Sequence, residues 1–466
     1  MNPLVTPCAG LLSTAAVLPD VPDVEPRLSA WAASVQDCLA GSRAIEAYGR
    51  VERVSATLVV ARLPGCRIGH LCELSCKAGD GKPALAEVIG FDGSSTLLAP
   101  LAPTDGLAER TLVRALGRPH EIAVGPHLLG QVLDGFGRPL LPSCASPDRA
   151  CPRKPVLAAA PAATERPRIA DKLSTGVRAI DALLTLGRGQ RIGLFAGPGC
   201  GKTTLLGALA RGIEADVVVF ALVGERGREL NEFLEREVDA VLATRSVVVC
   251  SSADRTPMER VRAAFTATAI ADGFRATGKH VLLLIDSLTR VARAQREIGL
   301  AAGEPPGRQG LPPSVYSMLP RLVERAGTTM SGAVTAVYTV LVESGASDPI
   351  AEEARSLLDG HVVLSHELAE RGQFPAIDVL ASLSRTMNAV VDEPHRRDAA
   401  RLRALLARYR ELELLLTLGE YEAGHDEQND EAVSRYPRLL EFLQQELRVP
   451  SSWPDTLERL HATVRG

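Results

Sequence analysis

The fold is decided by the stretch Gln190-Arg191-Ile192-Gly193-Leu194-Phe195-Ala196-Gly197-Pro198-Gly199-Cys200-Gly201-Lys202-Thr203-Thr204. Its apolar run at 192–196 predicts a buried strand, a glycine-rich turn follows, and the residues after Lys202 have helical character. Glycines in such a turn let the backbone bend tightly and point its N–H groups inward. A strand, a glycine-rich loop and a helix in this order predict a phosphate-binding loop, although Ala196 stands where the consensus has glycine.

The predicted loop supplies most of a nucleotide site. The residues expected to bind the nucleotide are Gly197, Pro198, Gly199, Cys200, Gly201, Lys202, Thr203 and Thr204. The helix that begins near Lys202 adds the positive end of its dipole to the phosphate site. We expect Lys202 to reach the β- and γ-phosphates and the Thr203 hydroxyl to ligate Mg²⁺, so the predicted ligands are ATP and Mg²⁺.

Cys200 lies inside this loop and leaves two interpretations open. A thiol near a helix N-terminus ionises easily and is reactive, in which case thiol-blocking reagents abolish ATP binding unless nucleotide protects the site. The alternative is an inert thiol that such reagents do not reach.

Two carboxylates are predicted to complete the site. Asp286 ends one apolar run, and a carboxylate at the carboxyl end of a buried strand can hold Mg²⁺ beside Thr203. Glu225 directly follows another apolar run, and ATP hydrolysis needs a group that orients or deprotonates the attacking water. We therefore assign catalytic roles to Lys202, Glu225 and Arg226, with Arg226 stabilising charge on the γ-phosphate.

Length and composition bound the class of protein. The chain has 466 residues, which suggests about three domains, and its 46% hydrophobic and 23% charged content is typical of a globular protein. The net charge of −4 gives no support to a nucleic-acid partner. Nine cysteines, without a second pair at metal-ligand spacing, are interpreted as reduced thiols. No apolar run is long enough to span a bilayer and the first residues lack a cationic signal region, so we expect a cytoplasmic protein.

The pattern divides the chain into four predicted parts. Residues 1–43 form a proline-rich tail and a helix at 27–40 with one apolar face, which packs either on its own domain or on a partner or membrane surface. Residues 44–104 contain short alternating runs and predict a small antiparallel β-barrel. Residues 105–390 form a P-loop ATPase domain, and residues 391–466 form a helical domain with leucines at helical spacing.

In the ATPase domain, apolar strands alternate with amphipathic helices. The strands are expected near 192–196, 217–223, 246–250, 281–286, 334–342 and 377–381. The helices are expected near 203–213, 228–242, 257–277, 287–299, 314–326 and 349–358. This alternation predicts an α/β fold whose mainly parallel sheet has helices on both faces and binds its ligand at the carboxyl ends of the strands.

The sequence after the phosphate loop resembles the rotary-type ATPases, which are relatives of the F-type ATP synthase β subunit, in its motif Gly224-Glu225-Arg226. Further motifs narrow the resemblance to the type III secretion ATPases, which power the injectisome and the flagellar export apparatus. These motifs lie at 303–306 (GEPP), 310–315 (GLPPSV), 319–327 (LPRLVERAG), 356–361 (SLLDGH) and 374–385 (FPAIDVLASLSR). The resemblance covers roughly residues 45–445, and the segment at 418–424 (LGEYEAG) looks more like the injectisome branch.

The resemblance implies a homohexameric ring of RecA-like domains with ATP sites between neighbours. Each site then takes an arginine from the adjacent subunit, which by motif match is Arg385, and such fingers contribute about 10³–10⁵ in rate. The C-terminal domain would receive chaperone–substrate complexes, the N-terminal region would meet a stator protein, and the pore would hold a coiled-coil stalk. Synthase β subunits place a tyrosine near the adenine, but the corresponding stretch at 394–398 has no aromatic residue, which predicts loose discrimination among nucleotides.

The implied function is an ATP-hydrolysing motor that releases chaperones and unfolds secretion substrates, associated peripherally with the cytoplasmic face of the inner membrane. An injectisome ATPase is favoured over a flagellar export ATPase. An RNA-translocating ring ATPase is an alternative that needs a basic or aromatic single-strand site, yet residues 44–101 have only Tyr48 and Phe91 as aromatics. A non-catalytic nucleotide-binding subunit is a further alternative, against which the presence of Lys202, Glu225 and Arg385 argues.

Overall fold

The structure is a computed structural model that describes residues 28–29, 31–32, 34–36, 46–75, 83–141, 151–342 and 348–465. The chain divides into two compact units, Met1–Ala47 and Tyr48–Gly466. In the first unit the described residues between 28 and 36 are helical, and the side chains of Leu28 and Trp31 are exposed. The predicted helix is thus present in its described part, while the predicted tail lies outside the described residues.

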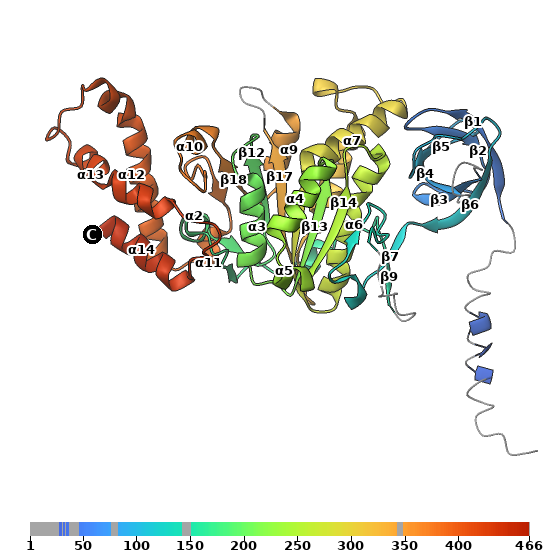
Figure 1. The fold of residues 1–466 in the computed structure, drawn as a ribbon, viewed down its shortest axis with the longest axis horizontal. Helices are drawn as coiled ribbons and strands as arrows, with labels where there is room; N and C mark the ends of the chain where they lie inside the picture. The colour runs from blue at the N-terminus through green and yellow to red at the C-terminus, as the bar shows by residue number, and fades with distance from the viewer. Residues whose placement is uncertain are drawn as a thin grey trace, which may run out of the picture. The chain divides into compact units, whose positions relative to one another are not determined.

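The second unit begins with a closed antiparallel barrel whose strands follow the order β1-β2-β5-β4-β3-β6 (Figure 1). The strands are β1 (Tyr48–Val54), β2 (Val59–Arg62), β3 (His70–Ser75), β4 (Ala84–Asp92), β5 (Ser95–Pro100) and β6 (Leu112–Pro119). Leu74, Leu98 and Val113 are fully buried, as expected of the side chains that alternate into a small barrel. The barrel is present as predicted, but its closing strand β6 lies beyond residue 104, where the sequence placed the end of this domain.

The next layer is a sheet with the strand order β19-β18-β12-β17-β15-β13-β14-β8. The strands in this order are β8 (Val132–Leu133), β12 (Arg191–Ala196), β13 (Val217–Val223), β14 (Ser246–Ser251), β15 (His280–Asp286), β17 (Ala333–Leu341), β18 (Gly360–Leu364) and β19 (Leu383–Ser384). A ninth strand, β16 (Gly327–Thr328), pairs with β17 in the antiparallel sense outside this order. All neighbours from β18 to β8 pair in parallel, and β19 pairs with β18 in the antiparallel sense. The carboxyl ends of the parallel strands therefore share one edge of the sheet.

The prediction of a strand at 377–381 is wrong, because the structure has no strand there. The position beside β12 belongs to β18, whose Val362 and Leu364 are buried, and Ile377 contributes only an isolated bridge to Leu364. The Asp378 side chain accepts hydrogen bonds from the N–H groups of Leu380 and Ala381, both at 3.0 Å. Such a local turn competes with strand formation, which apolar spacing alone does not reveal.

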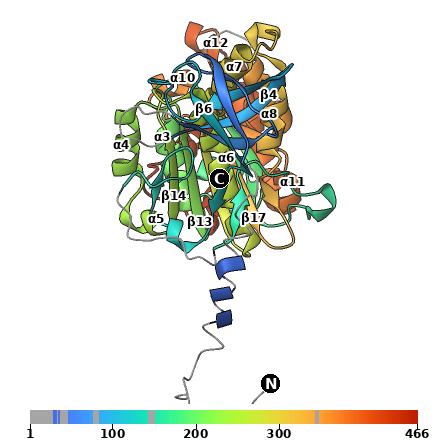
Figure 2. The ribbon, with the colours of Figure 1, turned by 90° about the vertical axis from the view of Figure 1, so that its right-hand side faces the viewer.

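Helices cover both faces of the sheet, because alternate residues of β13 pack into different clusters. Val217 and Val219 lie in the cluster that contains helix α6, while Val218 and Phe220 lie in the cluster that contains helices α3 and α4. Figure 2 shows α3 and α4 on one side of the strands and α8 on the other. The helices of this domain are α2 (Arg178–Leu183), α3 (Lys202–Gly212), α4 (Gly227–Glu237), α5 (Ala240–Thr244), α6 (Pro257–Ala276), α7 (Leu288–Ala301), α8 (Pro313–Val323), α9 (Pro349–Leu357), α10 (His366–Glu370) and α11 (Met387–Val390).

The single helix predicted at 228–242 is two helices, α4 and α5. The Asp239 carboxylate accepts a hydrogen bond from the N–H of Leu242 at 2.8 Å and so caps the start of α5. An N-cap residue has an extended backbone, which interrupts the preceding helix.

The chain ends in three helices, α12 (Glu393–Leu418), α13 (Glu427–Leu443) and α14 (Trp453–Arg465), as the leucine spacing predicts. Tyr409 and Tyr436 stack with ring centroids 3.4 Å apart and join α12 to α13. Arg178 at the start of α2 donates to the carbonyl of Phe442 at 3.1 Å, so the helical part docks on the ATPase domain. In the described parts of the chain, no helix has the length and apolar character needed to cross a bilayer.

His120 is a buried titratable group at the start of the segment that leads from the barrel into the sheet domain. Its Nε2 lies 3.0 Å from the carbonyl oxygen of Phe136. Burial is the main cause that lowers the pKa of His120 from 6.5 to about 4, and the charges of Arg262, Arg138 and Arg153 lower it further. The imidazole is therefore neutral in the folded protein at neutral pH.

We expect acid to destabilise the fold partly through His120. Between pH 6.5 and about 4 the unfolded chain binds a proton here that the folded chain does not, so stability is lost as pH falls, by at most about 3 kcal/mol. The variant His120→Gln keeps a donor for the Phe136 carbonyl and cannot titrate. Its thermal midpoint should fall less than that of the wild type between about pH 7 and pH 4. Parallel midpoint profiles would contradict this role.

Candidate active site

The phosphate loop joins the end of β12 to helix α3, as predicted. Gly199 and Gly201 have φ angles of 78° and 82°, and a Cβ at either position would meet no atom within 4 Å. Glycine is therefore needed at both for the left-handed backbone and not for space. None of the described side chains caps α3, which leaves the N–H groups of its first turn for a phosphate.

Lys202 meets two carboxylates that follow neighbouring strands. Its Nζ lies 2.6 Å from Oδ1 of Asp286 and 3.6 Å from Oε1 of Glu225. The two strands, β13 and β15, pair in parallel with Leu222 opposite Asp286, so both carboxylates emerge at the same edge. The structure thus brings together three residues that the sequence assigned from separate segments.

The Asp286 side chain is held in place by two neighbouring side chains of the protein. Its side chain is only 5% exposed, and Oδ1 accepts a hydrogen bond from the Thr339 hydroxyl at 2.7 Å in addition to the Lys202 contact. A carboxylate held in this way presents its oxygens in a defined direction, which suits a metal ligand or a group that orients metal-bound water.

Arg290 positions Glu225. Its Nη1 lies 2.7 Å from Oε2 of Glu225 and also donates to the carbonyl oxygen of Gly224. Arg290 is not among the site residues that the sequence predicts. The available signal was its place in the first turn of α7, four residues after Asp286, because a helix that follows a strand carries its first turn to the same edge.

Arg226 does not enter the cleft. Its side chain is 83% exposed and lies 3.8 Å from the Glu229 carboxylate, at the start of α4. The arginines that line the cleft are instead Arg236, Arg290 and Arg293. In this arrangement the positive charges beside Glu225 come from Arg290, at 2.7 Å, and from Lys202, at 3.6 Å.

The cleft itself has a volume of about 680 Å³ and opens at the carboxyl edge of the sheet. It is lined by the phosphate loop, by α4, by the first two turns of α7 and by the end of β17. Thr203 and Thr204 both line it and are exposed, so their hydroxyls are accessible to a ligand.

The oxygen donors in the cleft fit Mg²⁺. Within the described ranges, no group of three or more His, Cys, Asp or Glu side chains could hold a metal ion. Mg²⁺ is commonly held by one or two protein oxygens together with the phosphates of its nucleotide and with water. The hydroxyl of Thr203 and the carboxylate of Asp286 both line the cleft and are hard oxygen donors of that kind.

The Cys200 side chain is buried and does not line the cleft. It is 2% exposed, and its Sγ contacts the carbonyl oxygen of Pro198 at 3.7 Å. It packs in the same apolar cluster as Leu205 and Leu209 of α3. This placement favours the inert-thiol interpretation over the reactive one.

The expected finger Arg385 and the segment at 394–398 both lie away from this cleft. Arg385 is exposed and follows the edge strand β19. His395, in the segment compared with the adenine-binding region, is 5% exposed, and its Nε2 lies 2.8 Å from the carbonyl of Ala182. Burial lowers its pKa, and its ring meets that of Trp453 edge-on, so it is not available to stack on a base.

Barrel, parallel sheet and phosphate loop define a P-loop ATPase of the ATP synthase α/β kind. The family model for the β-barrel domain of the ATP synthase alpha/beta family matches residues 51–117, and the model for its nucleotide-binding domain matches residues 176–384. The model for the T3SS EscN ATPase C-terminal domain matches residues 391–462. The chain belongs to the type III secretion system ATPases, which are related to the flagellar ATPases and to ATP synthase.

Comparisons with individual relatives support the same family assignment. The chain is 56% identical over 422 residues to a type 3 secretion system ATPase of Pseudomonas syringae pv. syringae, covering 90% of this chain and 94% of the relative. It is 44% identical to the flagellum-specific ATP synthase of Bacillus subtilis, covering 92% and 97%. The solved structure of the assembled ATPase EscN from enteropathogenic E. coli superimposes with a TM-score of 0.84 at 45% identity, covering 89% of this chain and 100% of that one.

Glu225→Gln should abolish turnover and retain nucleotide binding. The amide keeps the shape of the side chain but cannot accept a proton from water, which predicts a loss of about 10²–10⁴ in kcat. ATPase rate and the affinity for a fluorescent ATP analogue are the two measurements. Glu235→Gln, on the exposed side of α4, is the matched control. A Glu225→Gln variant that turns over ATP at the control rate would remove Glu225 from the mechanism.

The Cys200 thiol should resist modification in the folded protein. Because the side chain is buried, a maleimide should label it only after denaturation, and ATP binding should survive treatment of the native protein. Peptide mapping by mass spectrometry gives the extent of labelling at Cys200. Complete labelling of the native protein with loss of ATP binding would restore the reactive interpretation.

Proposed function

We propose that the chain forms a homohexameric ring that hydrolyses ATP at sites shared between neighbouring subunits, as the motor of a type III protein export apparatus. One observation carries the proposal: Arg385 lies at the opposite end of the sheet from the phosphate loop of its own chain. An exposed arginine in that position can serve a nucleotide only on a neighbouring subunit.

The register of the sheet gives the separation. The Arg385 N–H donates to the carbonyl of Asp359 at 3.0 Å, and the Asp359 N–H donates to the carbonyl of Arg191 at 2.9 Å. Arg385 is therefore level with the first residue of β12, whereas the phosphate loop begins after Ala196, the last. Five residues of strand span roughly 17 Å at about 3.3 Å per residue, which exceeds the length of an arginine side chain.

Each residue of the shared site then has a role. Lys202 would exchange its carboxylate partners for the β- and γ-phosphates, and Glu225 would orient and deprotonate the attacking water. Thr203 and Asp286 would hold Mg²⁺, which neutralises charge on the phosphates. The adjacent subunit's Arg385 would add positive charge as the γ-phosphate is transferred.

The partners follow from the family and from exposed surfaces. EscN has been solved in complex with its central stalk EscO, and we propose that a coiled-coil stalk likewise occupies the pore of this ring. A stator protein would bind the N-terminal region, and chaperone–substrate complexes would bind the C-terminal helices. Leu414 and Leu418 support the last assignment, because they are 68% and 60% exposed near the end of α12 and apolar patches mark interaction surfaces.

The ring would release chaperones and unfold cargo at the cytoplasmic face of the inner membrane, with peripheral attachment and no nucleic-acid partner. Membership of the type III secretion ATPases argues against the RNA-translocating alternative. The identity of 56% to the type 3 secretion system ATPase of Pseudomonas syringae pv. syringae, against 44% to the flagellum-specific ATP synthase of Bacillus subtilis, favours the injectisome.

Arg385→Ala should lose activity without losing nucleotide. In the wild type, specific ATPase activity should climb with protein concentration as rings assemble. In the variant it should fall by about 10³–10⁵ because the finger is missing, while each subunit still binds ATP. ATPase rate against concentration and equilibrium nucleotide binding are measured together.

Arg397→Ala is the matched control, since Arg397 is another exposed arginine a short distance along the chain. It should behave as the wild type. A specific activity that is independent of concentration and indifferent to Arg385 would mean that each subunit works alone, and the shared-site proposal would fall.

A further inference from the structure

Gln190 is a fully buried polar residue for which nucleotide binding gives no explanation. It directly precedes β12, at the end of the strand remote from the phosphate loop. Its amide makes four hydrogen bonds, and three of them reach the segment that carries Arg385 or the strand beside it. We propose that Gln190 is a positioning residue for Arg385 and acts on the ATP site of the neighbouring subunit. This inference rests on the proposed role of Arg385 in trans.

The Gln190 amide forms hydrogen bonds with the residues on both sides of Arg385, and we call this set of hydrogen bonds the clamp. Its Nε2 donates to the Ser384 hydroxyl at 3.2 Å, and its Oε1 accepts from the Thr386 hydroxyl at 2.6 Å. The amide orientation is fixed independently, because Oε1 also accepts from the N–H of Gly187 at 2.9 Å and a backbone N–H can only donate.

The same amide also reaches Asp359, the residue directly before β18. Nε2 donates to the carbonyl of Asp359 at 3.4 Å, and this carbonyl also accepts from the N–H of Arg385 at 3.0 Å. Every donor and acceptor of the side chain is thus used. A replacement that cannot form hydrogen bonds would leave several buried polar groups without a partner.

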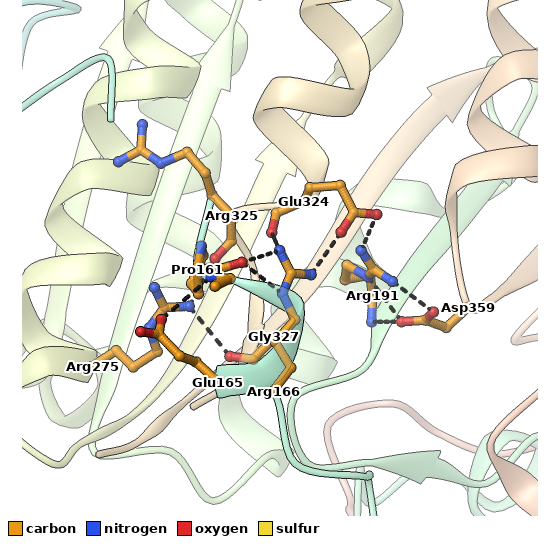
Figure 3. A network of polar contacts seen from close by, with 10 residues as sticks. Pro161, Glu165, Arg166, Arg191, Arg275, Glu324, Arg325, Gly327 and Asp359 are labelled. Carbon is orange, nitrogen blue, oxygen red and sulfur yellow. Dashed lines mark hydrogen bonds and ion pairs between the residues drawn. The ribbon is translucent and has the colours of Figure 1, made fainter. Parts of the chain in front are cut away.

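Asp359 is itself tied into a network of charges (Figure 3). Its carboxylate accepts two parallel hydrogen bonds from the Arg191 guanidinium, both at 3.0 Å, and Arg191 also pairs with Glu324. Arg166, from the segment that precedes the sheet domain, pairs with Glu324 at 2.6 Å. A bidentate ion pair fixes direction as well as distance. It therefore holds Asp359, whose carbonyl accepts the hydrogen bond from the Arg385 N–H, in a defined position.

The Arg385 side chain contrasts with this anchored backbone. It is exposed, and among the described residues no ion pair holds it. Its segment is therefore rigid while its guanidinium is free, which is the arrangement a finger needs to reach across an interface. Misplacing such a group by about 1 Å can cost about a hundredfold in rate, so the clamp has a measurable effect on turnover.

The decisive experiment mixes two defective subunits. Gln190→Met removes the amide at nearly constant volume, and should lower kcat by about tenfold to a hundredfold while ATP binding is unchanged. Lys202→Ala subunits have no working site but keep an intact finger. In mixed rings, a Lys202→Ala subunit gives that finger to a Gln190→Met subunit, so the activity of the mixture should exceed the sum of the two separate proteins.

A parallel mixture of Arg385→Ala with Lys202→Ala tests the shared ATP site separately from the role of Gln190. If both mixtures gain activity, the clamp acts in trans through the finger. If only the Arg385→Ala mixture gains, or if Gln190→Met weakens the binding of ATP to its own subunit, Gln190 acts within its own chain and the inference is overturned. If the Arg385→Ala mixture does not gain, the shared site itself fails and the inference fails with it.

A second variant guards against misfolding of Gln190→Met. Thr386→Val removes one hydroxyl from the clamp at a half-buried position, and Thr386→Ser retains it. Thr386→Val should lower kcat and Thr386→Ser should not. The double variant Thr386→Val/Arg385→Ala should be no slower than Arg385→Ala alone, since both changes act through one group. Additive losses in the double variant would overturn the inference.

Discussion

The structure depends on the parallel pairing of β12, β13, β15 and β17. Parallel hydrogen bonding aligns the carboxyl ends of strands that are distant in sequence, and each of these strands delivers one part of the site at that edge. β12 delivers the phosphate loop, β13 delivers Glu225, β15 ends in Asp286, and Thr339 of β17 holds Asp286 in place. Both faces of the sheet are covered by helices, so these strands read as nearly continuous apolar runs, and the charged residues at their ends stand out.

The same alignment gives the sheet a second functional end. The amino end of β12 carries Gln190 and Arg191, which hold Asp359 and through it the segment of Arg385. In the proposed ring, this strand would have the nucleotide of its own subunit at one end and the arginine finger for another subunit at the other. This polarity would suit a ring, since neither end alone would contain every charge that hydrolysis requires.

Ion pairs join the barrel to the sheet domain and link distant segments within the sheet domain. Arg262 of α6 and Glu87 of β4 form a buried pair that joins the sheet domain to the barrel. Arg166, Glu324 and Arg191 form partly buried ion pairs across the sheet domain (Figure 3). Removing one partner of a buried pair leaves an uncompensated charge, so these contacts specify how the parts meet more than they add stability.

The sequence by itself determined the order of barrel, α/β sheet and helical domain, and it determined the phosphate loop, because apolar periodicity and glycine spacing are local properties of the chain. It also selected Lys202 as part of the glycine-rich loop, and Glu225 and Asp286 because charged residues at the ends of apolar runs are visible without coordinates. Only the tertiary structure decided the contacts between distant segments. It replaced the expected strand at 377–381 by β18, put Arg226 in solvent and Arg290 beside Glu225, and buried Cys200. The clamp of Gln190 on Ser384 and Thr386 joins residues nearly two hundred positions apart, and no periodicity within a chain encodes a hydrogen bond of that range.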